Sequence, residues 1–292
     1  MNHRDYHSRA GDETAVGVDI GATLAKLAAR QGSAAPRFWL LPAEALDEIA
    51  RQVEALAPDR IGLTGGGAAE LAQRLTRAAT RVAEFDAWGS GANALLPESG
   101  REPDPPYLLV SLGTGTSILL VDSDGVRRVG GTALGGGTVV GLGVAVLDTS
   151  RFQELVGLAS KGSHGAVDLL VSDIYRADER PLPGELTAAS FGKLGWRRGD
   201  RHPARTDLAL AVMRLVGENV ALLCGSLATA AGISTIVFAG STLRDNPVLV
   251  RILCQVSGAF GCRPMHLPNG EFAGALGALL LARSDGETAA KP

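Results

Sequence analysis

Runs of apolar residues that end in a glycine-rich turn occur twice along the chain. The first run and turn occupy residues 16–23, and a second apolar run begins at Leu24. The second copy occupies residues 108–116, and apolar residues resume from Ser117 to Val121. Apolar segments that flank glycine and small hydroxyl residues are typical of a strand, a tight turn and a returning strand. The pattern therefore predicts two similar hairpins.

The rest of the pattern is that of an α/β chain. A strand followed by small residues at 61–66 has a partner at 236–241, in the same order as the hairpins, and residues 44–56 carry the three- and four-residue apolar spacing of an amphipathic helix. Two matched pairs of segments predict two similarly folded lobes with a ligand cleft between them. The expected division is a disordered leader at 1–14, an N-terminal lobe at 15–100 and a C-terminal lobe at 106–285.

Composition excludes several classes of protein. The net charge of −3 gives no electrostatic argument for nucleic-acid binding, and three cysteines without CxxC spacing argue against a disulfide framework or a zinc site. The longest apolar stretch, residues 208–231, is interrupted by Arg214, Glu218 and Asn219, which favours a buried helix over a membrane span. Residues 1–14 resemble neither a signal peptide nor an anchor, so we expect a cytoplasmic protein without a membrane partner.

The two turns carry residues suited to phosphate. Asp19 closes the first strand and could hold a magnesium ion through water, while the following amides and Lys26 engage phosphate. An ordinary hairpin with a turn aspartate is the alternative, and duplication of the motif argues against it. Residues 113–117 combine two glycines with three hydroxyls, which favours phosphate binding over a plain turn. The glycines at 135–137 precede a helix, whose free N–H groups would attract an anion; a plain linker is the alternative.

Two charged residues are candidates for the reaction itself. Glu70 opens a helix expected at 68–79 and could accept a proton, or it could simply favour the helix N-terminus electrostatically. Either Arg127 or Arg128 must face the cleft if their strand borders it, although both could be solvated charges. A GxGxxA pattern at 89–94 lacks a preceding strand, and the chain contains no GxxxxGK[ST] phosphate loop.

These segments resemble type II pantothenate kinases, which have the α/β fold of two duplicated ribonuclease H-like lobes of the actin/Hsc70/sugar kinase type with an ATP cleft between the lobes. The resemblance runs from about Val16 to Leu281. Its motifs are residues 18–26, 63–66, 84–87, 113–117, 127–131, 135–137, 183–189 and 272–279.

The resemblance implies ATP- and Mg²⁺-dependent phosphorylation of pantothenate to 4'-phosphopantothenate, the first step of coenzyme A biosynthesis, by a homodimer. Asp19 would hold the metal, and Arg128 would contact the substrate. The ATP-binding positions that it implies are Gly21, Ala22, Thr23, Lys26, Thr114, Gly115, Gly136, Gly137, Thr138, Phe152 and Ser241.

One position departs from the family pattern. A gap-free match places Gln73 where the family has its catalytic glutamate, and an amide cannot accept a proton at neutral pH. We therefore expect Glu70, one turn earlier, to be the base. The alternatives are a kinase for a related substrate such as pantetheine or a sugar, and a weakly active nucleotide-binding regulator.

Overall fold

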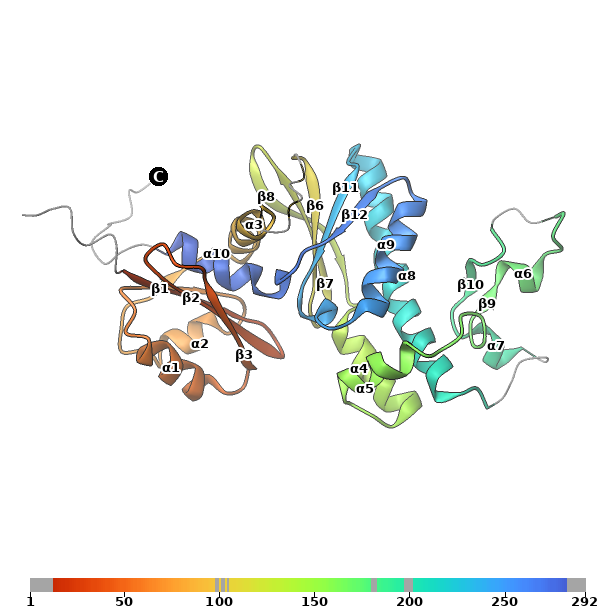
Figure 1. Ribbon diagram of the computed structural model, residues 1–292, viewed down its shortest axis with the longest axis horizontal. Coiled ribbons are helices and arrows are strands. Elements are labelled where there is room, and N and C mark those ends of the chain that lie inside the picture. The colour runs from red at the N-terminus through yellow and green to blue at the C-terminus, as the bar shows by residue number, and fades with distance from the viewer. Residues whose placement is uncertain are drawn as a thin grey trace, which may run out of the picture.

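Two five-stranded sheets with the same strand order form the centre of the molecule (Figure 1). The computed structural model describes residues 13–97, 100, 103, 105–179, 183–196 and 202–282. The N-terminal sheet has the order β3-β2-β1-β4-β5 and consists of β1 (Thr14–Ile20), β2 (Leu24–Gln31), β3 (Arg37–Pro42), β4 (Arg60–Thr64) and β5 (Thr80–Arg81). The C-terminal sheet has the order β8-β7-β6-β11-β12 and consists of β6 (Tyr107–Leu112), β7 (Thr116–Asp122), β8 (Gly125–Thr132), β11 (Thr235–Ala239) and β12 (Arg263–His266).

The two sheets have one topology. In each, the first three strands form an antiparallel meander, and the fourth strand pairs in parallel with the first. The fifth strand then pairs in parallel with the fourth. This repetition confirms the predicted fold class of two duplicated lobes.

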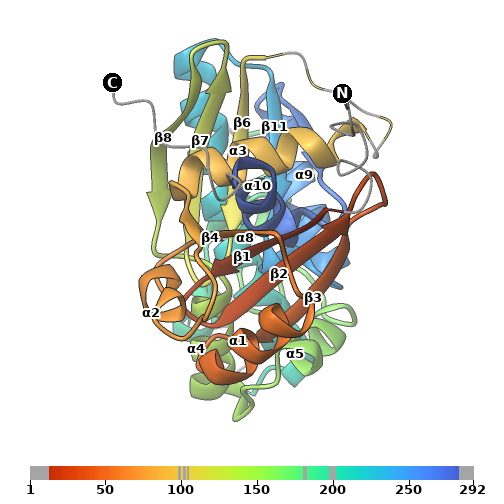
Figure 2. The same cartoon turned by 90° about the vertical axis from the view of Figure 1, so that its left-hand side faces the viewer.

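Helices cover the outer faces of both sheets and fill the space between them. The N-terminal sheet is covered by α1 (Leu46–Ala55) and α2 (Ala68–Ala72), and the C-terminal sheet by α4 (Gly136–Leu147), α5 (Phe152–Ala159), α8 (Arg205–Ala231) and α9 (Pro247–Ala259). Between the sheets lie α3 (Glu84–Leu95) and α10 (Ala273–Leu281), which Figure 2 shows with α10 nearly end-on. The short helices η2 (Ser241–Leu243) and η3 (Gly270–Phe272) follow β11 and β12.

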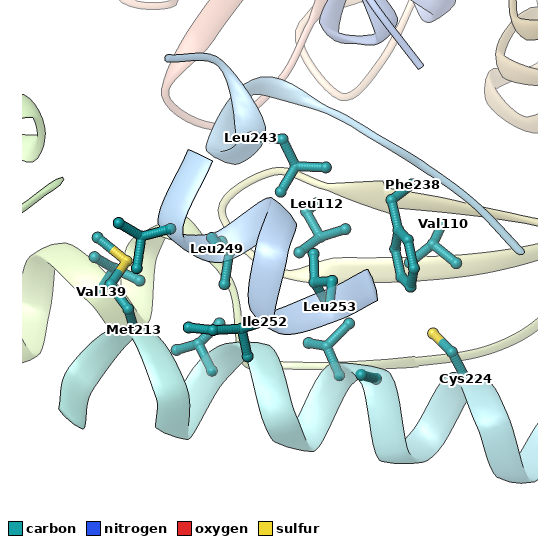
Figure 3. Close-up of a cluster of buried hydrophobic side chains, with 14 of the residues drawn as sticks. Val110, Leu112, Val139, Met213, Cys224, Phe238, Leu243, Leu249, Ile252 and Leu253 are labelled. Carbon is teal, nitrogen blue, oxygen red and sulfur yellow. The ribbon is translucent and has the colours of Figure 1, made fainter. Parts of the chain in front are cut away.

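Alternation along the buried strands creates three hydrophobic cores. Val16, Val18 and Ile20 of β1 face α1 and α2, whereas Leu109 of β6 faces the layer of α3 and α10. The opposite face of β6 packs Val110 and Leu112 against α8 and α9, where Phe238, Met213 and Leu249 complete the core (Figure 3). The interlayer of α3 and α10 therefore belongs to the packing of both sheets.

Small residues let the two interlayer helices approach closely. A Cβ at Gly277 of α10 would lie 1.7 Å from the carbonyl oxygen of Ala87, and a Cβ at Gly91 of α3 would lie 1.8 Å from that of Ala273. A Cβ at Gly17 of β1 would lie 2.0 Å from the carbonyl oxygen of Ala275. Glycine is required at these positions because backbone lies against backbone. Gly89 and Gly91 of the GxGxxA pattern are thus packing residues within a helix.

A small projection, here called the arm, extends from the C-terminal lobe before α8 (Figure 1). It consists of β9 (Leu169–Leu170), α6 (Val171–Ile174), β10 (Thr187–Ala189) and α7 (Gly192–Gly195). Helix α8 itself is long and apolar enough to cross a membrane, and it is the one such helix among the described residues. Because 67% of its most apolar window is buried against the rest of the protein, it is a core helix, as the sequence predicts.

Some boundaries differ from expectation. The helix expected at 68–79 ends at Ala72, and α3 is a helix that the sequence analysis did not anticipate. Of the expected leader, residues 1–12 lie outside the described residues, and Thr14 already belongs to β1. Helix α10 falls in the expected C-terminal range but packs on the N-terminal sheet, so the division into chain ranges stays a prediction.

Candidate active site

The two glycine turns face each other across a cavity. Thr23 Oγ1 and Thr114 Oγ1, one from each turn, lie 3.0 Å apart and share a hydrogen bond. The cavity, about 350 Å³, is lined from the N-terminal lobe by residues 19 and 21–24, Lys26, Glu84 and Trp88. From the C-terminal lobe it is lined by Ser111, residues 113–117, Thr132, Gly240 and Ser241. We call it the first cavity. It brings together Asp19, Gly21, Ala22, Thr23, Lys26, Thr114, Gly115 and Ser241, eight of the predicted site residues.

A larger cavity of about 800 Å³ adjoins it and is called the second cavity. The two share Thr23, Leu24, Gly113, Thr114 and Ser241. The second cavity also contains the predicted residues Gly136, Gly137 and Phe152, together with Leu40 of β3 and Val140 of α4. The two cavities therefore adjoin at the contact between Thr23 and Thr114.

Asp19 and Lys26 form a buried ion pair at the base of the first cavity. They are register partners on β1 and β2, and Lys26 Nζ lies 3.5 Å from Asp19 Oδ2. Their residues are only 3% and 8% exposed. Burial raises the pKa of Asp19, and the positive charge of Lys26 opposes that shift. A buried carboxylate with one cationic partner is well suited to a cation carried in by a phosphate ligand.

Glu84 adds a second carboxylate to the first cavity. It lies in the first turn of α3 and lines the cavity, although it is an exposed residue, as Glu70 and Gln73 are. Partial burial is the main reason that its pKa is raised; repulsion from Asp19 raises it further and Lys26 opposes both. A raised pKa makes a carboxylate a better proton acceptor near neutral pH. Residues 84–87 are one of the motifs shared with the family, but the sequence alone gave Glu84 no role.

The structure does not bring Glu70 to either cavity. Its side chain is 60% exposed and forms a 3.0 Å ion pair with Arg74 Nη2. Gln73, at the C-terminal end of α2, is also exposed and lines neither cavity. Neither side chain reaches the cleft, so this geometry gives no support to Glu70 as the base.

The glycine segment before α4 does not have the free amides that were predicted to bind phosphate. The N–H groups of Gly136 and Gly137 donate to the carbonyl oxygens of Gly113 and Thr114, at 2.8 and 3.0 Å, so they brace the second turn and are not free for an anion. Thr138 lines neither cavity; its hydroxyl bonds Gly135 N and the Ala133 carbonyl.

Arg128 lies beside the first cavity without lining it. A β-bulge shifts the pairing of β7 with β8 next to Arg128, and its guanidinium lies against the main chain of Gly131, the neighbour of the cavity residue Thr132. Arg127 instead pairs with Asp122 at 2.6 Å, away from the cleft. Arg128 is thus the arginine of the two that lies nearer the site.

Comparison with known proteins agrees with this geometry. The Fumble family matches residues 43–281. The type II pantothenate kinase of Staphylococcus haemolyticus (strain JCSC1435) is 34% identical over 266 residues, which are 91% of this chain and 99% of that protein. The type II pantothenate kinase of Staphylococcus aureus (strain MRSA252) is 33% identical over 268 residues, 92% of this chain and 99% of that protein.

Solved structures share the fold at low sequence identity. Component A of the (R)-2-hydroxyglutaryl-CoA dehydratase of Acidaminococcus fermentans has a TM-score of 0.63 at 17% identity, over 92% of this chain and 97% of that one. A ROK family glucokinase from Streptomyces griseus, solved with glucose and AMPPNP, has a TM-score of 0.57 at 13% identity, over 92% and 99%. At these identities the likeness extends to the fold alone.

Proposed function

Because this chain belongs to the type II pantothenate kinase (Fumble) family, we propose that it transfers the γ-phosphoryl group of ATP to the primary hydroxyl of pantothenate in the cleft between its sheets. The observation that carries this proposal is the convergence of both glycine turns, the Asp19–Lys26 pair and Glu84 on one cavity. The enzyme is thus a phosphotransferase with an alcohol as acceptor.

The adjoining cavities suggest where each substrate binds. The adenosine part of ATP fits the second cavity, with Phe152, Val140 and Leu40 as apolar walls, and the phosphates extend between Thr23 and Thr114 into the first. Pantothenate then enters the part of the first cavity that is not shared, beside Glu84. Arg128 is placed for a substrate that extends past Thr132.

The donors at the site fit a magnesium ion bound together with the nucleotide. Among the described residues no group of three or more His, Cys, Asp or Glu could hold a metal, whereas Mg²⁺ commonly keeps its waters and uses one or two carboxylates plus substrate phosphates. Asp19 is the carboxylate for this role, through water. When bound, the ion neutralises charge on the phosphates.

Glu84 serves as the general base in this mechanism. The pantothenate hydroxyl gives its proton to the Glu84 carboxylate as its oxygen bonds to the γ-phosphorus, and the bond from that phosphorus to the bridging oxygen breaks to release ADP. Lys26 Nζ offsets negative charge at the base of the cavity. The regulator hypothesis assumed that Gln73 replaced the base; with Glu84 at the cavity that assumption is unnecessary.

A second copy of the chain is the partner that we propose for the arm. The arm and its adjoining segments expose large apolar side chains, at Ile174, Tyr175, Leu186, Leu194 and Trp196. Large apolar side chains gathered on a projection favour a protein interface. Light scattering of the intact protein tests this homodimer, and a monomer at micromolar concentration would contradict it.

Paired substitutions test the base assignment. Glu84→Gln should reduce kcat by about 10²–10⁴-fold, because the amide cannot take the hydroxyl proton. Glu70→Gln is the matched control and should retain the wild-type rate. ADP release coupled to NADH oxidation, with pantothenate and pantetheine compared, gives both the rates and the preferred acceptor. A large loss in Glu70→Gln alone would restore Glu70 as the base and overturn Glu84.

A further inference from the structure

Trp88 is a buried side chain of the first cavity that the mechanism leaves without a role. It is only 6% exposed, yet it lines the cavity. It lies four residues after Glu84 on α3, and residues four apart share one face of a helix. Glu84 and Trp88 are the two residues of α3 that reach this cavity. Both side chains therefore line the cavity in which we place the acceptor.

The polar atom of this indole has no partner within the described part of the chain. Asp19 is bonded to Lys26, and Trp88 does not contribute a hydrogen bond to that carboxylate. A Cβ at Gly274 would lie 2.7 Å from Asp19 Oδ2 and 3.0 Å from Trp88 Nε1, so the indole nitrogen lies near the acidic end of the cavity, over the start of α10. Buried Trp N–H groups usually have an acceptor, and a ligand oxygen can supply it here.

Pantothenate has groups that match this pair of residues. Next to its reacting primary hydroxyl it has a carbon with two methyl groups and then a secondary hydroxyl. Glu84 and Trp88 lie four residues apart on α3, a rise of about 6 Å, which is of the same order as the spacing of two hydroxyl oxygens on an extended three-carbon unit. The apolar indole ring suits the methyl groups, and the indole N–H suits the second oxygen.

We propose that Trp88 is a substrate-recognition residue, whose N–H donates a hydrogen bond to the secondary hydroxyl of pantothenate while its ring packs against the adjacent methyl groups. This inference rests on the proposed function. It assigns the enzyme a preference for acceptors that carry a second oxygen two carbons beyond the reacting carbon. Acceptors without that oxygen leave the indole N–H without this hydrogen bond and bind more weakly.

A cycle of one variant and one substrate analogue tests the proposal. Trp88→Phe keeps an aromatic ring and removes the N–H, and 2-deoxypantothenate lacks the secondary hydroxyl. We expect the wild type to have a roughly tenfold higher KM for the analogue than for pantothenate, the scale of one hydrogen bond. Trp88→Phe should raise the KM for pantothenate by a similar factor. Its KM for the analogue should stay within twofold of the wild-type value. The KM for ATP should stay unchanged.

Controls separate this inference from the proposed function. Trp39 on β3 packs in the core beneath α1 and α2 and lines neither cavity, so Trp39→Phe is the matched control for loss of an indole. Wild-type turnover of pantothenate decides the function itself, independently of any variant. Equal loss by Trp88→Phe on both acceptors, or no discrimination between them by the wild type, would overturn the role of Trp88 and leave the kinase assignment intact.

Discussion

The two lobes have one topology but contribute different chemistry to the cleft. On β1 and β2 the second pair of register partners from the turn is Asp19 and Lys26, a buried ion pair. On β6 and β7 the corresponding partners are Ser111 and Ser117, two hydroxyls. Both pairs line the first cavity. The two lobes therefore have the same strand arrangement, but at this position the N-terminal lobe has charged side chains and the C-terminal lobe has neutral hydroxyls.

The largest effect should come from removing the charge in the N-terminal lobe. Asp19→Asn leaves Lys26 buried without its anionic partner and removes the carboxylate for the metal. We expect kcat to fall by about 10²–10³-fold, the scale for loss of one preorganised electrostatic group. Ser111→Ala, its counterpart in the C-terminal lobe, should cost tenfold at most, because it removes a single neutral hydrogen bond. Steady-state rates at saturating ATP measure both, and equal losses would remove the proposed division of chemistry.

Substitutions at the contact between α3 and α10 should lower the stability of the protein more than substitutions elsewhere in the scaffold. Gly277→Val places side-chain atoms against the carbonyl of Ala87 and should destabilise the protein by about 1–3 kcal/mol or more. Gly157→Ala on α5 is the matched control, because a Cβ there meets nothing within 4 Å, and it should be neutral or stabilising by up to about 1 kcal/mol. Urea unfolding monitored by circular dichroism compares the two. A Gly277→Val protein as stable as the wild type would show that the lobes do not depend on this contact.

The pH dependence of turnover reports on the N-terminal carboxylates. Glu84 must be ionised to accept a proton, and its pKa is raised above the ordinary value of 4.5 by burial and by Asp19. Activity should therefore fall as the pH falls through that raised pKa, at higher pH than for an ordinary glutamate. The Glu70→Gln variant should lose activity over the same acidic pH range as the wild type. An acid limb at 4.5 or below in the wild type would contradict the role of Glu84.

A smaller effect should arise in the C-terminal lobe, at His164 before the arm. Burial, followed by the charges of Arg214 and Lys193, lowers its pKa from 6.5 to about 4. The unfolded chain then binds a proton that the folded protein does not, so this group's contribution is lost as the pH falls from 6.5 to about 4. His164→Gln should lose less stability than the wild type across that window. Urea unfolding at several pH values measures the difference, and parallel curves would contradict it.

The strands of both lobes could be predicted from sequence because buried runs are strongly apolar and end at turn residues. The strand expected at 235–239 is β11, and the helix expected at 44–56 contains α1. Helix α3 was missed because Gly89 and Gly91 are poor helix formers. Gly91 is needed for the contact with α10 and Gly89 for the contact with Val126 of β8, and both partners are distant in sequence and give no local signal.

The cavity residues that lie on the two turns could be predicted from sequence, whereas those on a helix face could not. Thr23 and Thr114 meet as the matched hairpins suggest. The sequence offered Glu70 and Gln73 for the base, and neither lines a cavity, whereas Glu84 lines the first; spacing within a helix does not reveal which helix faces the cleft. The glycines at 135–137 suggested free amides, but the neighbouring turn carbonyls accept those of Gly136 and Gly137.

A crystal structure with a non-hydrolysable ATP analogue and pantothenate would show where both substrates bind. We expect the triphosphate at the turns that carry Thr23 and Thr114, and the primary hydroxyl of pantothenate within about 2.6–3.2 Å of the Glu84 carboxylate. A triphosphate bound outside this cleft, or a hydroxyl that approaches Glu70 instead, would contradict it.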